Sequence, residues 1–135
     1  MITNTVSFIP ELSYPLEKLA PAGQVLFFDI ETTGFSPSSS SLYLIGCASQ
    51  ASEGAWQLTQ WFGESLSDES EILEAFFRFA SRYRYLVHFN GEGFDLPYLK
   101  NCCAQYHMDC GLTALESLDL LRLLRPCRQF LGLSS

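Results

Sequence analysis

Two carboxylates, Asp29 and Glu31, stand two positions apart at the end of an apolar run. The run at residues 25–30, VLFFDI, has the composition of a buried strand, and side chains alternate between the two faces of a strand. Both acids should therefore point to one face, at a spacing of about 7 Å, where their charges repel unless a cation lies between them. Mg²⁺ binds oxygen ligands of this kind, usually one or two carboxylates plus a substrate phosphate. A solvated strand end would show the same pair of acids, so this pair alone leaves both interpretations open.

A second apolar stretch, YLVHF at residues 85–89, predicts another strand, and Asp95 follows it after the turn NGEGF at residues 90–94. Neighbouring parallel strands deliver side chains to one edge of a sheet, so three carboxylates are expected to meet there. Asp95 also precedes a helical pattern with Pro97 in its first turn, which is typical of a helix N-cap. The two roles are compatible, and the first acidic motif favours the metal ligand. His88 is predicted to pack in the core and not to act as a base.

These motifs resemble the first two motifs of the DEDD 3′-to-5′ exonucleases, in DIETTG at residues 29–34 and NGEGFD at residues 90–95. The closer likeness is to the bacterial YprB-type ribonuclease-H-like domains, and it lies in LVHFNGEGFDLPYL at residues 86–99 and SLDLLRLLR at residues 117–125. The resemblance covers residues 24–125. It implies an α/β fold of the ribonuclease-H-like class: a mixed sheet, with an antiparallel meander followed by parallel strands, and helices packed on it.

The resemblance also implies a function, the metal-dependent hydrolysis of phosphodiester bonds at a single-stranded 3′ end of nucleic acid. Two Mg²⁺ or Mn²⁺ ions would be held by Asp29, which would bridge them, and by Glu31 and Asp95, which would each help to hold one. The residues expected at the substrate are Thr32, Thr33, Gly34, Asn90 and Phe94. Asp119 resembles an acid that such families carry before their last motif, and we do not count it as catalytic.

The family's fourth carboxylate, carried by a later helix, has no counterpart, because no acidic residue follows Asp119. We therefore expect a fold that is incomplete at the C-terminus, with a downstream segment or a partner supplying the missing acid. The alternative is a truncated, non-catalytic fragment that binds metal or nucleic acid without cleaving it. A plain structural domain would require both acidic motifs to be coincidental.

Composition and charge predict one globular domain that does not grip nucleic acid by bulk electrostatics. Of the 135 residues, 47% are hydrophobic and 17% are charged, and the net charge is −7. The charge is uneven: residues 1–75 hold one lysine and ten acids, whereas residues 76–135 hold seven bases and five acids. Any phosphate-facing surface should come from the second part. Arg122, Arg125 and Arg128 would form a stripe there on a helix, or an ordinary solvated face.

The cysteines and the hydropathy pattern predict a reducing location. The cysteine count is five, an odd number, without a C-x-x-C pair, so reduced and mostly buried thiols are expected. A zinc site at Cys103, His107 and Cys110 would lack a fourth ligand. The sequence has neither an apolar run long enough to span a membrane nor an N-terminal signal pattern, so we predict a cytoplasmic protein without a membrane partner.

Local patterns predict the order of elements. Residues 1–23 are expected to be an irregular leader that packs through Phe8, Leu12 and Leu16, and residues 24–135 are expected to form the domain. Residues 42–49 and 55–62 predict a hairpin around Glu53 and Gly54. A capping box of Asp68 and Glu71 should open a helix. That helix should bury Ile72, Leu73, Phe76, Phe77 and Ala80, and a second helix from about Leu96 should present a stripe of Leu96, Leu99, Cys103 and Tyr106.

Overall fold

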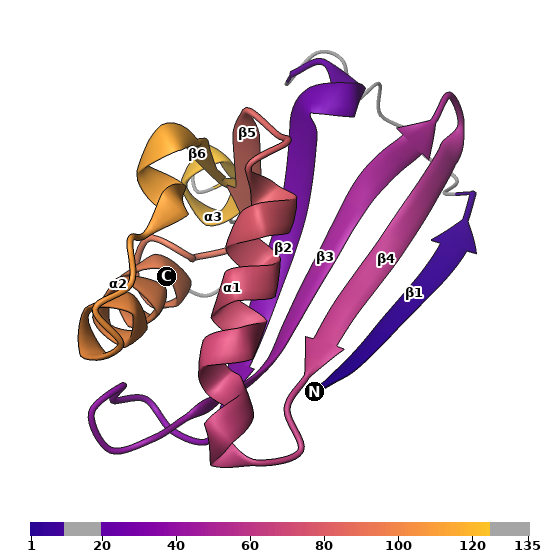
Figure 1. Ribbon diagram of the computed structural model, residues 1–135. Helices are drawn as coiled ribbons and strands as arrows, with labels where there is room; N and C mark the ends of the chain where they lie inside the picture. Colours follow the sequence, from indigo (N-terminus) through magenta and orange to yellow (C-terminus); the bar gives the residue numbers. More distant parts are fainter. Residues whose placement is uncertain (10–19, 125–135) are drawn as a thin grey trace.

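A mixed β-sheet forms the centre of the protein. The computed structural model describes residues 1–9 and 20–124, and in these residues six strands lie in the order β1-β4-β3-β2-β5-β6 (Figure 1). The strands are β1 Ile2–Phe8, β2 Val25–Thr32, β3 Leu42–Ser52, β4 Ala55–Phe62, β5 Tyr85–His88 and β6 Glu116–Asp119. β1, β4, β3 and β2 pair antiparallel, whereas β5 is parallel to β2 and β6 is parallel to β5. The predicted meander followed by parallel strands is confirmed.

Two helices, α1 and α2, lie on one face of this sheet (Figure 1). The helices of the described residues are α1 Glu69–Ala80, α2 Asp95–Gln105 and α3 Leu120–Leu124, with short 3₁₀ turns at Ala22–Gln24, Leu66–Asp68 and Gly111–Ala114. No helix among the described residues is long and apolar enough to cross a membrane. The parallel strands follow the antiparallel half of the sheet. α1 precedes β5, and α2 connects β5 to β6, because parallel strands need crossover connections of this kind.

The hairpin between β3 and β4 turns where the sequence predicts it. Gly54 has a φ of 76°, a left-handed conformation that glycine adopts without steric cost. β3 continues to Ser52, three residues beyond the predicted end, because its pairing with β4 extends through an irregularity between Gln50 and Ser52. The long β3 joins β4 to β2 and fixes their register.

The main core lies between α1, α2 and the sheet. α1 buries Ile72, Leu73, Phe76 and Ala80 as predicted, while Phe77 is half-buried against the same core. Phe76 stacks on Phe28 of β2 with ring centroids 5.5 Å apart. Each such fully buried side chain stabilises the fold by about 1.5–3 kcal/mol. The aromatic residues of α1 are thus core residues and are not available to nucleic-acid bases.

The buried face of α2 differs in part from the face that the sequence predicts. The expected residues were Leu96, Leu99, Cys103 and Tyr106, and the buried ones are Asp95, Tyr98, Leu99, Cys102 and Cys103. The buried face is rotated by about one residue, because α2 packs its Tyr98 and Cys102 side against α1 and the sheet. Tyr106 is 39% exposed, and its hydroxyl donates a hydrogen bond of 2.6 Å to Oε1 of Glu69.

Two further local predictions are wrong. Residues 2–8 are not irregular: they form β1 and pair with β4 over their whole length. Asp68 does not cap α1 through its side chain, because its Oδ2 instead accepts the N–H of Glu64, at 2.9 Å, and lies 3.2 Å from the Met1 ammonium group. Leu12 and Leu16 lie outside the described residues, and the domain boundary at residue 24 stays a prediction.

The thiols behave as predicted in the described part of the chain. Cys47, Cys102 and Cys103 are buried and Cys110 is half-buried, and all four are free. Burial raises the pKa of Cys102 and of Cys103 to about 12, so both are inert thiols at neutral pH. Cys127 lies outside the described residues.

Candidate active site

Asp29 and Glu31 lie on β2, opposite Gly46 and Leu44 of β3. Their alternation with the core residue Phe28 is as predicted: Phe28 is 6% exposed, and both acids are exposed. They therefore point to the face of the sheet that α1 does not cover. The pairing register of β2 fixes this arrangement. A shift by one residue would turn both acids toward the core and Phe28 toward solvent.

A cleft of about 370 Å³ opens on this face next to the two acids. Its lining is Phe27, Phe28, Asp29, Glu31, Leu44, Gly46, Cys47, Ala48, Leu58 and Gln60. Gly46 lies directly across from Asp29 and leaves room there because it has no side chain. Sequence reasoning missed Gly46, whose only signal was a glycine inside a strand pattern. The cleft combines apolar walls with two carboxylates, and its volume suits a small ligand.

Asp95 approaches the same acids from the other side of β2. β5 pairs with β2 only as far as Phe27 and ends at His88, so the second half of β2 is not paired with β5. The first residue of α2, Asp95, lies in this position and is 6% exposed. Its carboxyl group lies close enough to Asp29 for the charges of the two side chains to interact, and the backbone of Ile30 and of Asp95 itself lies beside it.

The environment of Asp95 raises its pKa to about 6, from an ordinary value of 3.8. Burial is the largest cause, and the negative charge of Asp29 and the hydrogen bond between the two carboxyl groups add to it. The backbone N–H groups act in the opposite direction. Phe94, not Asp95, occupies the N-cap position of α2, and no side chain caps this helix. The N-cap role considered for Asp95 is therefore wrong, and its carboxyl group faces Asp29 instead.

The turn that presents Asp95 is fixed by residues of β6. Asn90 has a left-handed φ of 57°, and its N–H donates to Oδ1 of Asp119 at 2.8 Å. The same oxygen accepts the N–H of Leu121 at 3.0 Å. Asp119 is 5% exposed. It acts in this structure as an anchor between the turn, β6 and α3, a role that the sequence did not reveal.

His88 and Gly91 hold the start of the turn at residues 90–94. Nδ1 of His88 accepts the Gly91 N–H at 3.0 Å, and its Nε2 lies 2.5 Å from Oγ of Ser117. Burial lowers the pKa of His88, so the ring is neutral and packed in the core, as predicted. A Cβ on Gly91 would lie 2.4 Å from Nδ1 of His88, so no other residue fits there without a shift. The close contact with His88 explains why position 91 is a glycine.

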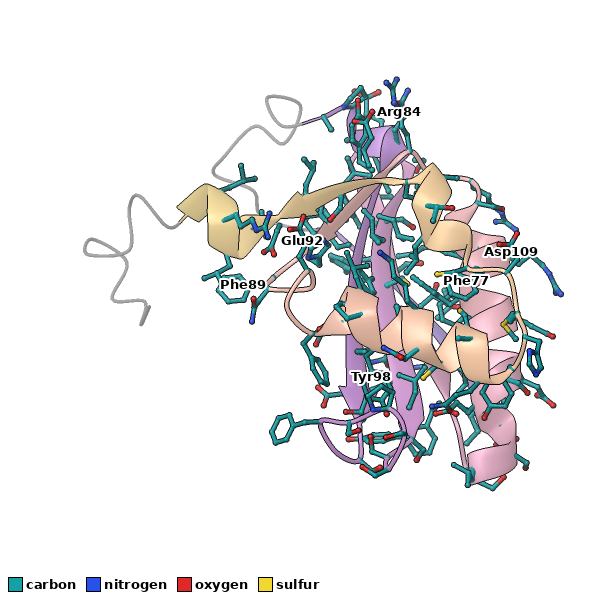
Figure 2. The ribbon with its side chains drawn as sticks, turned by 90° about the vertical axis from the view of Figure 1, so that its left-hand side faces the viewer. Phe77, Arg84, Phe89, Glu92, Tyr98 and Asp109 are labelled. Atoms are coloured by element: carbon teal, nitrogen blue, oxygen red, sulfur yellow. The ribbon has the colours of Figure 1, made fainter. Side chains whose placement is uncertain are left out.

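The predicted substrate residues lie around these acids, and two of them have hydroxyl groups that hold their own loop. Oγ1 of Thr32 donates to the carbonyl oxygen of Gly34 at 2.7 Å, and Oγ1 of Thr33 accepts the N–H of Ser41 at 2.9 Å. Further along this loop, Oγ of Ser40 lies 2.8 Å from the hydroxyl of Tyr98 on α2 (Figure 2). The loop after β2 is thus attached to α2, and Thr32 and Thr33 offer mainly backbone to a ligand.

An aromatic pair joins the loop after β2 to the turn before α2. Phe35 lies edge-on to Phe94, with ring centroids 6.3 Å apart, and is 92% exposed. Sequence reasoning included Phe94 and missed Phe35, although a single aromatic residue in the polar segment 34–41 was a usable signal. Its position beside Phe94, which directly precedes Asp95, makes this exposed ring a candidate for ligand contact.

Glu92 on the same turn forms an ion pair with Arg122 of α3, at 2.6 Å between Oε2 and Nη1. Figure 2 shows Glu92 and Phe89 beside α3, away from Tyr98. Arg122 is therefore partly neutralised, and the other members of the predicted stripe, Arg125 and Arg128, lie outside the described residues. The phosphate-facing stripe stays a prediction.

Within residues 1–9 and 20–124, no three histidine, cysteine, aspartate or glutamate side chains are grouped closely enough to hold a metal ion. The structure therefore brings Asp29 and Asp95 together, and Glu31 lies with Asp29 in the cleft, but the three acids do not form a three-ligand group. The donors present, all carboxylate oxygens, still fit a hard divalent cation and no softer metal.

The family profile of the RNase_H superfamily matches residues 26–134, most of the chain. The chain belongs to this superfamily. The match spans β2 with Asp29 and Glu31 as well as the turn and helix with Asp95. No curated protein sequence matches this RNase_H-superfamily chain.

Solved structures with the same fold include nucleases. The chain is similar to the family B DNA polymerase from the hyperthermophilic archaeon Pyrobaculum calidifontis, with a TM-score of 0.63 and 20% identity over 85% of this chain. It is also similar to E. coli Exonuclease I in complex with a dT13 oligonucleotide, with a TM-score of 0.55 and 18% identity over 76% of this chain. The chain spans 17% of the polymerase and 29% of the exonuclease. At these identities the likeness establishes the fold.

Proposed function

We propose that this RNase_H-superfamily domain hydrolyses phosphodiester bonds in nucleic acid, from a single-stranded 3′ end, with Mg²⁺ or Mn²⁺ as cofactor. The observation that carries the proposal is the contact between the Asp29 and Asp95 carboxyl groups, beside a cleft that also contains Glu31. The nuclease-type fold supports it, since exonuclease I shares that fold. We place the activity in the cytoplasm, as the sequence predicts.

A buried carboxyl group next to a second carboxyl group is unfavourable unless one of them is protonated or a cation lies between them. Asp95 has a pKa of about 6, so near neutral pH its carboxyl group is mostly ionised, and a divalent ion beside it would offset the negative charge. Asp29, together with Glu31 and Asp95, would hold such ions. When bound, such a pair of ions supplies an activated water and stabilises the leaving oxygen.

The substrate is expected to approach across the loop after β2. The exposed ring of Phe35, supported edge-on by Phe94, offers a surface on which a base can stack. Thr32, Thr33 and Gly34 lie between Glu31 and Phe35 in the sequence, and Asn90 begins the turn that ends at Phe94. These groups would position the terminal nucleotide, while the three carboxylates would hold the ions next to its phosphate.

The proposal requires a fourth carboxylate, which we expect from a downstream segment or from a partner. One observation favours the non-catalytic alternative: three ligands do not converge among the described residues. A domain that binds metal or nucleic acid without cleavage would keep the Asp29–Asp95 contact and the aromatic pair. The nuclease and the non-catalytic domain would therefore both bind metal or nucleic acid, and only the nuclease would cleave the nucleic acid.

The test uses a 3′-labelled single-stranded DNA and an RNA of the same sequence, incubated with the chain in Mn²⁺ or in EDTA. In Mn²⁺, and not in EDTA, we expect the unmodified chain and the control variant Asp109→Asn to remove terminal nucleotides from the substrate. We expect Asp29→Ala to remove none. Asp109 is an exposed acid at the far end of α2 from Glu92 (Figure 2). Binding without shortening would establish the alternative. Equal shortening by Asp29→Ala would mean a contaminating nuclease and would overturn the proposed site.

A further inference from the structure

β1 is an edge strand with an open side. It pairs with β4 along one side, and among the described residues no strand pairs with its other side (Figure 1). All seven of its residues are exposed. An edge of this length leaves backbone N–H and C=O groups free to pair with another strand. Proteins usually prevent this with lysine, proline or a bulge, and the sequence of β1, ITNTVSF, contains no charge and no proline.

The neutrality of this edge is local. The chain carries a net charge of −7, yet neither β1 nor its neighbour β4, AWQLTQWF, has a charged side chain. At one end of β1 the Met1 ammonium group contacts Asp68 at 3.2 Å, and at the other end Phe8 pairs with Trp56, next to the hairpin turn that holds the exposed Glu53. A pairing of two β1 strands would therefore place no like-charged side chains opposite each other within the strands.

The sequence of β1 is complementary to itself in one antiparallel register. If Thr5 of one copy faces Thr5 of a second copy, then Thr3 faces Ser7, so hydroxyl groups meet on one face of the sheet. On the other face Ile2 meets Phe8, and Asn4 meets Val6. The Ile2–Phe8 pairs and the hydroxyl pairs are of the kind that stabilises a sheet, whereas Asn4 opposite Val6 is a mixed pair that adds no such complementarity. The Met1–Asp68 contacts of the two copies then lie at opposite ends of the strand pair.

We propose that β1 is a self-association edge, at which it pairs antiparallel with β1 of a second copy about a two-fold axis at Thr5. The result is one continuous sheet across both copies. Ile2 and Val6 are each 48% exposed and Phe8 is 38% exposed, and they share the sheet face of Asp29 through the pairing of β1, β4, β3 and β2. Because the axis is perpendicular to the sheet, both acidic clefts open on the same side of the dimer.

The contact is one short strand pair, smaller than the roughly 1,200–2,000 Å² of a typical stable interface. We therefore expect a reversible dimer that dissociates on dilution. Sedimentation equilibrium should show a dimer that increases with protein concentration. A monomer at every concentration up to the millimolar range would overturn the proposal, whatever the outcome of the nuclease assay.

A cysteine at the two-fold axis tests the register. In the proposed pair, Thr5→Cys alone should form an intermolecular disulfide under mild oxidation, because directly opposite residues lie within disulfide reach. Thr3→Cys alone should not, since it faces Ser7, and Thr3→Cys combined with Ser7→Cys should. Mass spectrometry of the digested, non-reduced dimer identifies the linked peptides and separates them from links through the native cysteines. Equal cross-linking by Thr5→Cys and Thr3→Cys would overturn this register.

A charge at the axis gives an independent test. Thr5→Lys places two ammonium groups opposite each other, whereas Thr3→Lys places each opposite Ser7. We expect Thr5→Lys to weaken self-association at least about tenfold more than Thr3→Lys, and high salt to restore part of the loss. Circular dichroism confirms that both variants are folded. Equal dimerisation by Thr5→Lys and the unmodified chain would exclude the β1 edge.

Discussion

Asp95, at the start of α2, lies close to Asp29, on β2, and the negative charge of Asp29 adds to burial in raising the pKa of Asp95 to about 6. The two residues are far apart in the sequence and come together because β5 stops short and leaves the second half of β2 accessible to α2. The contact makes the acidic cleft a site of excess negative charge, which several measurements can detect.

The first prediction concerns pH. Because the folded-state pKa of Asp95 is raised from 3.8 to about 6, the folded protein keeps a proton that the unfolded chain releases in this window. The Asp95 contribution to stability is therefore largest below pH 3.8 and is lost as the pH rises to 6, by up to about 3 kcal/mol. Urea unfolding of Asp95→Asn and of the unmodified chain, without metal, should show a stability difference that grows in favour of Asp95→Asn from pH 4 to 6. A constant difference would contradict the raised pKa.

The second prediction concerns Asp29. Asp29→Asn removes one of two carboxylates in contact, so the metal-free protein should become more stable at pH 7.5 by about 1–2 kcal/mol. The same substitution should abolish most of the Mn²⁺-induced rise in melting temperature, which for a ligand at about 100 times its dissociation constant corresponds to roughly 2.7 kcal/mol. Asp109→Asn, at an exposed acid, should change neither value. An intact Mn²⁺ response in Asp29→Asn would mean that Asp29 is a solvated strand-end residue.

The third prediction concerns the anchor of the turn. Asp119→Ala removes the acceptor of the Asn90 and Leu121 N–H groups, so it should destabilise the protein by about 1–3 kcal/mol and speed hydrogen exchange at both amides. Asp119→Asn keeps an oxygen acceptor and should lose less. Exchange measured by NMR distinguishes the two. If both variants behave alike, the charge of Asp119, and not its hydrogen bonds, holds the turn.

The fourth prediction is a coupling between His88 and Gly91. Gly91→Ala pushes a methyl group into the His88 ring, with a Cβ to Nδ1 distance of 2.4 Å, and should be strongly destabilising. In a His88→Ala background the ring is absent, so the same substitution should cost at least about 1 kcal/mol less. Chemical denaturation of the two single variants and the double variant provides the cycle. Additive effects would show that the close contact does not determine the choice of glycine.

The fifth prediction concerns Phe35. Because this ring is 92% exposed, Phe35→Ala should change the free energy of unfolding by less than about 0.5 kcal/mol. It should weaken the binding of a single-stranded oligonucleotide by about 1–3 kcal/mol, the contribution of one stacked base. Fluorescence anisotropy measures the affinity, and Phe89→Ala, at a 51% exposed ring beside α3, is the control (Figure 2). Equal affinities of the two variants would remove Phe35 from the site.

The sequence by itself determined what depends on local periodicity. Alternation along β2 placed Asp29 and Glu31 on the face opposite Phe28, and the apolar spacing of α1 predicted four of its buried residues. The glycine at position 54 marked the hairpin. These features follow from contacts within a few residues or from the period of one element, so no knowledge of distant partners was needed.

The tertiary structure decided what depends on contacts between distant segments. β1 looks irregular in the sequence and becomes a strand because β4 supplies its hydrogen-bond partners. Asp95 has the local pattern of an N-cap, yet its carboxyl group faces Asp29, because the early end of β5 leaves that position open. Asp119 acquires its anchoring role only from the parallel pairing of β5 with β6, which brings it beside Asn90. A backbone group or a carboxylate takes the partner that the fold brings within reach, and local sequence does not specify that partner.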